Sequence, residues 1–89
     1  MNRVSVSHAG DERFAVIIEE NGSESRHEVT ATAAQVDRIA AGRDPADLVE
    51  ASIRFLLDRE SKESIMARFD LDTISRFFPE YETTIAEYL

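Results

Sequence analysis

The chain has 89 residues, of which 43% are hydrophobic and 31% are charged, a balance typical of one globular domain. It has no cysteine, which excludes disulfides, thiolate metal sites and cysteine nucleophiles. The formal net charge of -8 opposes binding to nucleic-acid phosphates and to anionic membranes, and no apolar run is long enough to cross a bilayer. We therefore expect residues 1–89 to form a single acidic, soluble domain of the cytoplasm, with no membrane partner.

Residues 3 to about 31 are predicted to form a three-stranded antiparallel β-meander. Val4 and Val6 alternate with serines, and residues 13–20 are rich in strand formers. Asn21 and Gly22 favour a two-residue hairpin turn, because a type I′ turn needs positive φ angles at both positions. The length of the first connection decides which face of the sheet Val4 and Val6 join, and both alternatives are open. We favour the face that carries residue 14.

The turn at residues 21 and 22 also predicts the register of the second hairpin. Residues 14, 16, 18 and 20 would lie opposite residues 29, 27, 25 and 23, in that order. This register gathers four apolar side chains on one face: Phe14, Val16, Ile18 and Val29. A slip by one residue would place charged residues opposite the same face: Glu24, Arg26 and Glu28. The first register is therefore preferred.

Residues 32–89 are predicted to form three to four helices that pack on the meander, which gives an α+β fold. Thr32 and Gln35 have the spacing of a capping box, and Gly42 is typical of the end of the short helix that follows. Asp44 and Pro45 predict the start of a longer helix that reaches to about residue 60. This helix has an apolar stripe: Leu48, Val49, Ile53, Phe55, Leu56 and Leu57.

Three shorter segments complete the predicted helical part. Ser61 is expected to cap a helix from residue 62 to about 69, and Asp70 or Asp72 to cap another from 73 to 78. Pro79 cannot continue a helix without a break, but it can begin a last helix from 79 to 89. A single helix kinked at Pro79 is the alternative, because apolar residues keep a roughly helical spacing across it.

Residue types with catalytic or metal-binding chemistry are present without the spacing that such sites require. His8 and His27 both lie in the predicted sheet, and no third ligand accompanies them. Asp70 and Asp72 lack the glycine and glutamate of a calcium loop. No serine has a base at the spacing of a nucleophile motif. We therefore expect a protein that is not an enzyme and has no cofactor, metal or evident small-molecule ligand.

Residues 64–78 have the outline of a helix-turn-helix, with a short apolar helix, a turn and a second helix start. In that interpretation Arg68, Thr73, Ser75 and Arg76 would face outward, and such side chains suit phosphate and base contacts. The buried positions are closer together than is usual for this motif, and acidic residues surround it. A DNA-binding regulator is therefore the alternative function, and nucleic acid is disfavoured as a partner.

The aromatic residues concentrate in residues 69–81, which hold three of the five Phe and one of the two Tyr. Phe77 and Phe78 point about 100° apart on a helix, so burial of one does not bury the other. An exposed Phe beside Arg76 and Tyr81 has the composition of an interface hot spot. The candidate interaction surface is Arg76, Phe77, Phe78 and Tyr81. The spacing also assigns a core role to part of the cluster: Phe69, Leu71, Ile74 and Tyr81.

A family resemblance is carried by residues 44–65, which read Asp-Pro-Ala-Asp-Leu-Val-Glu-Ala-Ser-Ile-Arg-Phe-Leu-Leu-Asp-Arg-Glu-Ser-Lys-Glu-Ser-Ile, and by the strings Phe-Asp-Leu and Arg-Phe-Phe-Pro-Glu-Tyr-Glu. Together, over residues 44–82, they resemble a group of small bacterial proteins of unknown function. The resemblance brings no catalytic or binding residue with it. From the residues themselves we expect a small acidic interaction or regulatory module. It would bind an unidentified protein, or a second copy of itself through an edge of the sheet.

Overall fold

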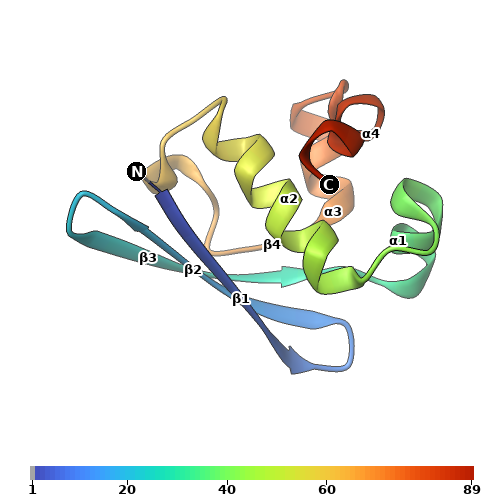
Figure 1. Ribbon diagram of the computed structural model, residues 1–89, viewed down its shortest axis with the longest axis horizontal. Helices are drawn as coiled ribbons and strands as arrows, with labels where there is room; N and C mark the ends of the chain where they lie inside the picture. Colours follow the sequence, from blue (N-terminus) through green and yellow to red (C-terminus); the bar gives the residue numbers. More distant parts are fainter. Residues whose placement is uncertain (1) are drawn as a thin grey trace.

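The computed structural model describes residues 2–89 and has an α+β fold with a four-stranded mixed sheet and four α-helices. The sheet forms one layer, and the helices lie on one side of it (Figure 1). The strands follow one another across the sheet in the order β1-β2-β3-β4. The α+β class is as predicted, whereas the sheet has one strand more than the predicted meander. No helix within residues 2–89 is long and apolar enough to cross a membrane.

The second hairpin joins β2 (Arg13–Glu20) to β3 (Ser23–Thr30) in the predicted register. Asn21 and Gly22 both have positive φ angles, of 52° and 81°, as a type I′ turn requires. The four apolar residues that this register gathers are all buried on the inner face: Phe14, Val16, Ile18 and Val29. The turn chemistry and the pattern of apolar residues therefore specify the same pairing.

β1 (Asn2–Gly10) pairs antiparallel with β2 and sends Val4 and Val6 to the inner face, as favoured from the sequence. The turn between the two strands has only two residues, a length that by itself would send the valines to the other face. A bulge between His8 and Gly10 adds the odd residue that restores them to the inner face.

β4 (Arg68–Asp70) pairs parallel with β3 and is the strand that the sequence did not predict. In place of the helix expected from residue 62, the chain makes one short 3-10 turn (Lys62–Ser64) and then runs extended. The N–H of Glu28 on β3 donates to the carbonyl of Ala67 at 2.7 Å. The segment is too short to be stable as an isolated helix, and the edge of β3 offers its backbone other partners. The expectation of three antiparallel strands alone was therefore wrong.

The first two helices follow the sequence closely. Helix α1 (Ala33–Ala40) begins with the capping box, in which Thr32 and Gln35 each accept a hydrogen bond from the other's backbone N–H. Helix α2 (Pro45–Leu57) is capped by Asp44 and lies over the inner face of the sheet (Figure 1). The apolar stripe of α2 is buried, apart from its last leucine, which is half-buried. The helix ends a few residues before its predicted boundary.

The C-terminal segment folds back over α2 as three short helical pieces (Figure 1). Helix α3 (Leu71–Phe77) comes first, followed by α4 (Tyr81–Thr84) and a 3-10 turn (Ile85–Tyr88). Pro79 lies between α3 and α4 and separates them, so the chain does not form a single kinked helix. The last predicted helix is therefore shorter than expected and changes to 3-10 geometry before the end.

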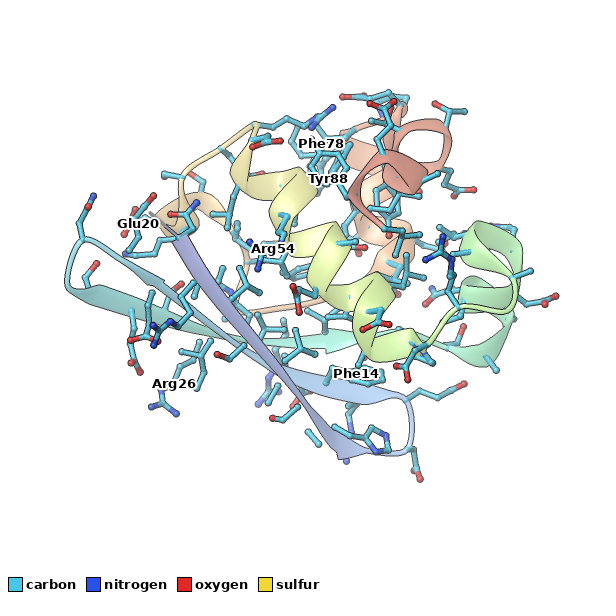
Figure 2. All side chains as sticks on the ribbon, in the orientation of Figure 1. Phe14, Glu20, Arg26, Arg54, Phe78 and Tyr88 are labelled. Carbon is cyan, nitrogen blue, oxygen red and sulfur yellow. The ribbon has the colours of Figure 1, made fainter. Side chains whose placement is uncertain are left out.

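Aromatic contacts attach the C-terminal pieces to α2. The ring centroids of Phe78, Tyr81 and Tyr88 lie 5.9, 5.2 and 5.8 Å from that of Phe55, all in edge-on orientations. The guanidinium of Arg59 lies over the Phe55 ring, 3.7 Å from its centroid. Figure 2 shows Phe78 and Tyr88 together above α2. Each such aromatic pair adds about 0.5–1.5 kcal/mol beyond the area that it buries.

Candidate interaction groove

An apolar groove of about 270 Å³ opens between the end of α2, the segment that leads into β4, and α3. Buried side chains make up much of its lining: Leu56, Ile65, Phe69 and Ile74. Three polar residues also line it: Glu60, Ser64 and Thr73. Sites for drug-sized molecules have volumes of about 300–1,000 Å³, so this groove suits one large side chain of a partner.

Met66 and Phe77 are the large hydrophobic side chains left exposed within residues 2–89, and both line the groove. Phe77 is 68% exposed and Met66 is 42% exposed. Full burial of such a side chain stabilises by about 1.5–3 kcal/mol, of which the isolated chain gains only a part here. Aromatic residues and Met are enriched in interfaces, and the flexible thioether of Met adapts to irregular surfaces. The uncovered apolar surface therefore gathers at one place.

The position of Met66 is fixed by hydrogen bonds from β3. The Nδ1–H of buried His27 donates to the Met66 carbonyl at 2.7 Å, since a carbonyl oxygen can only accept. The other ring nitrogen, Nε2, lies 2.8 Å from the hydroxyl of Ser25. The next residue, Ala67, accepts the N–H of Glu28. One side of the groove is therefore attached to the sheet at two consecutive carbonyls.

Helix α3 forms the other side of the groove, and Asp70 fixes where it starts. The Asp70 carboxylate accepts the backbone N–H of Thr73 at 2.9 Å and its hydroxyl at 3.0 Å. Ile74 faces the core and is buried, and Phe78 is half-buried. Residues adjacent on a helix point about 100° apart, so this orientation leaves Phe77 on the outer side.

Glu60 is the acidic group of the groove. Burial raises the pKa of its carboxyl, because the apolar surroundings disfavour the charged form. No Lys or Arg of residues 2–89 forms an ion pair with it. The two cations nearest in sequence have other acidic partners, since Arg59 pairs with Glu80 at 3.0 Å and Lys62 pairs with Glu63. The Glu60 carboxylate can therefore accept a cation from outside the chain.

The residues predicted as the interaction surface divide into two groups. Arg76 and Phe77 are exposed, and Phe78 is half-buried. Tyr81 is 0% exposed, and its hydroxyl lies 2.6 Å from the Ser52 hydroxyl inside the core. Its place in the predicted surface was therefore wrong, whereas the core role that spacing gave it agrees with its burial.

The residues of the DNA alternative sit among acidic side chains. The Thr73 hydroxyl donates to Asp70, and the Ser75 hydroxyl donates to Glu82 at 2.8 Å. The Ser75 bond lowers the pKa of the Glu82 carboxyl, which keeps it ionised. Arg68 and Arg76 are exposed, but Arg68 lies on β4, where the first helix of a helix-turn-helix would be. The predicted outline of that motif is therefore not formed.

Among the residues that line the groove, the predicted sites included Thr73, Phe77 and Phe78. Seven others were not assigned to a site from the sequence: Leu56, Glu60, Ser64, Ile65, Met66, Phe69 and Ile74. Leu56 belonged to an apolar stripe assigned to the core, Glu60 to the predicted end of the same long helix, and Met66 to the helix predicted from residue 62 to about 69. A usable signal was Met66, since Met is frequent in adaptable binding surfaces. The pattern alone does not reveal that these residues meet α3.

Comparison with known proteins adds no assignment, because no family model, curated protein or solved structure matches this chain. The resemblance to small bacterial proteins over residues 44–82 therefore stays a prediction. Within residues 2–89 there is also no group of three or more His, Asp or Glu side chains arranged to hold a metal ion. The geometry of the groove is thus the basis for a functional proposal.

Proposed function

We propose that this protein is an interaction module whose groove binds an amphipathic helix of a protein partner. The observation that carries the proposal is the shared location of Met66 and Phe77, both exposed on one groove with a buried apolar lining. An apolar groove of this kind suits the mode in which a partner helix inserts an anchor side chain. Exposed aromatic side chains at such places supply much of the binding energy in interfaces.

Charge complementarity indicates a basic partner. Glu60 brings an unpaired carboxylate to the apolar groove, and Glu63 lies exposed close by in the sequence. The chain as a whole carries a formal charge of -8, so a cationic helix would be attracted and an acidic one repelled. The partner helix would therefore carry one large apolar anchor and a Lys or Arg one turn away, which could pair with Glu60.

The polar groups of the groove support binding better than catalysis. The hydroxyl of Thr73 donates to Asp70, and the hydroxyl of Ser64 lies 3.3 Å from that of Ser61. The Ser64 hydroxyl has no base as its hydrogen-bond partner, although an activated nucleophile needs one. The Asp70 carboxylate beside the Thr73 hydroxyl also accepts the Thr73 backbone N–H as the cap of α3. Glu60 is the acid that remains, and a single carboxylate beside apolar residues recognises a cation or a donor.

Selection of helical peptides from a displayed library tests this function. We expect enriched sequences to carry a large apolar residue with Lys or Arg three or four positions away. Phe77→Ala should weaken the selected peptides at least tenfold, roughly 1.4 kcal/mol, without a change in melting temperature, because the side chain is exposed. Peptides that bind this variant as well as the parent would show that the groove is not the binding site.

A second pair of variants tests the role of the carboxylate. Glu60→Gln should weaken binding of the basic peptides, while Glu87→Gln, which removes the same charge from an exposed site outside the groove, should not. Because burial disfavours the charged form of Glu60, its replacement should leave the protein at least as stable at neutral pH. Equal weakening in the two variants would indicate only the general attraction of an acidic protein for a basic peptide.

A further inference from the structure

The two edges of the sheet differ in how they are protected against pairing with another strand. β4, at one edge, has three residues and begins and ends with charged side chains, Arg68 and Asp70. Short length and charge are the usual protections of an edge strand. β1, at the other edge, has nine residues and contains neither Pro, Lys, Asp nor Glu. Its regular part runs from Asn2 to the bulge after His8, and no strand of residues 2–89 pairs with its outer side.

The pairing identifies which backbone groups of β1 face outward. In a two-residue hairpin the residues next to the turn form a hydrogen-bonded pair, so the even-numbered residues of β2 bond to β3. The N–H of Ala31, which donates to the carbonyl of Glu12 at 2.8 Å, fits this alternation. The odd-numbered residues of β2 therefore bond to Ser5 and its odd-numbered neighbours in β1. The outward N–H and C=O groups belong to the even-numbered ones: Asn2, Val4, Val6 and His8.

We propose that β1 pairs antiparallel with β1 of a second copy, so that two sheets join into one of eight strands. One register uses every outward group, with Asn2 opposite His8 and Val4 opposite Val6 of the other copy. The two-fold axis then passes between the two Ser5 residues, which form a pair without mutual hydrogen bonds and with close side chains. Val4 and Val6 keep their side chains on the inner face, where Val6 is half-buried and would gain cover.

The charges of the edge favour a second copy of the same chain over other strands. The chain has eighteen acidic residues, yet residues 2–10 contain none, and their only Arg is Arg3. In the proposed register Arg3 lies opposite Ser7 of the other copy, so no like charges meet across the new pairing. A strand from elsewhere in this acidic chain would bring carboxylates to the same edge. The long unprotected edge is therefore also the one at which two copies approach with least repulsion.

Sedimentation equilibrium and amide hydrogen exchange, at several concentrations of the unmodified chain, test the proposal directly. We expect a reversible dimer, with protection of the Val4 and Val6 amides that rises with concentration. The Ser5 and Ser7 amides should be protected throughout, because they bond to β2. A monomer at all concentrations, or Val4 and Val6 amides that never gain protection, would overturn the proposal.

A matched pair of substitutions then identifies the surface. Ser5→Lys places two cations opposite each other at the two-fold axis and should raise the dimer dissociation constant about tenfold. Ser23→Lys adds the same charge at an exposed position of the other hairpin and should leave the constant unchanged. Equal effects of the two variants, or no effect of Ser5→Lys on an existing dimer, would contradict pairing through β1. Because the exchange experiment uses the unmodified chain, a variant that fails to fold does not decide the outcome.

Discussion

At the scale of single residues, the buried hydrogen bond between Tyr81 and Ser52 shows how an interface candidate becomes part of the core. The Ser52 hydroxyl donates to the Leu48 carbonyl at 2.7 Å, so it accepts from the Tyr81 hydroxyl. Burial of Tyr81 therefore requires a small polar residue on α2, and the otherwise apolar buried face of this helix provides one at position 52. The two polar groups satisfy each other inside a core that excludes water.

This arrangement predicts an asymmetry between two conservative substitutions. Tyr81→Phe leaves Ser52 with its donated bond and should cost about 0.5–1.5 kcal/mol in the free energy of unfolding. Ser52→Ala leaves the buried Tyr81 hydroxyl without an acceptor and should cost more, about 1–3 kcal/mol. The double variant should be more stable than Ser52→Ala alone. Urea titrations of the three variants measure the difference, and a larger loss from Tyr81→Phe would contradict this hydrogen-bond direction.

Tyr81 also predicts how stability depends on pH in alkaline solution. Burial raises the pKa of its hydroxyl from 10.0 to about 12, so the folded chain holds this proton more tightly than the unfolded chain does. The stabilisation is fully present below pH 10 and is lost as the pH rises toward 12, at about 1.4 kcal/mol per pH unit. Unfolding free energies measured across this range should fall less steeply for Tyr81→Phe. Parallel curves for parent and variant would contradict the shift.

At the scale of elements, the groove depends on α3, which is too short to be stable without its cap and its packing. The helix has seven residues, and Asp70 satisfies a free N–H of its first turn. Thr73, Ile74 and Phe77 of the groove all belong to this helix. A local weakening of α3 should therefore affect binding more than it affects the rest of the fold.

Asp70→Ala should lower the free energy of unfolding by about 0.5–2 kcal/mol, and amide exchange should quicken mainly in α3. Asp70→Asn should retain most of the stability, since Asn is also a good cap. Asp44→Ala is the matched control, because Asp44 caps α2 through the N–H of Ala46. If Asp44→Ala quickened exchange in α3 as much as Asp70→Ala does, the cap would have no local role at the groove.

Elements with local signals could be predicted from the sequence. The turn at Asn21 and Gly22, the capping box at Thr32 and the start of α2 at Asp44 each depend on residues close together in the chain, and all three form as expected. β4 depends instead on an edge of β3 that lies about 40 residues away in sequence, and Phe69 becomes a strand residue only through that contact. A pattern within the segment itself does not contain this information.

The candidate site shows the same difference between features set by neighbouring residues and features set by distant contacts. Adjacent Phe77 and Phe78 could be recognised as a pair that faces two ways, because the helical angle between neighbours is a local property. Which one is exposed depends on the contact of Phe78 with Phe55, and the depth of Tyr81 depends on Ser52. Glu60 and Met66 join the groove only because the extended segment returns beside α3. Composition alone suggested that an interface exists. Which residues form it is determined by tertiary contacts.

At the scale of the whole molecule, the charge distribution separates the proposed function from its DNA-binding alternative. Residues 44–89 hold eleven of the eighteen acidic residues, and the groove lies within this half. A surface of this sign attracts a basic helix and repels duplex phosphates, and both effects weaken as salt screens them. The dependence of binding on salt and on Arg therefore distinguishes the two functions.

We expect no binding of duplex DNA in fluorescence anisotropy at 50 mM salt, where phosphate contacts are strongest. A helical peptide with one Phe anchor and several lysines should bind. Its affinity should decrease as the salt concentration rises from 50 to 500 mM. A version of the peptide with glutamates in place of the lysines should bind more weakly. Removal of two cations by Arg68→Ala and Arg76→Ala should leave the lysine peptide bound at least as tightly, since the protein becomes more acidic. Duplex binding that is lost in this double variant would instead favour DNA. The two arginines, and not the groove, would then form the main binding surface, because DNA-binding proteins neutralise phosphates with such side chains.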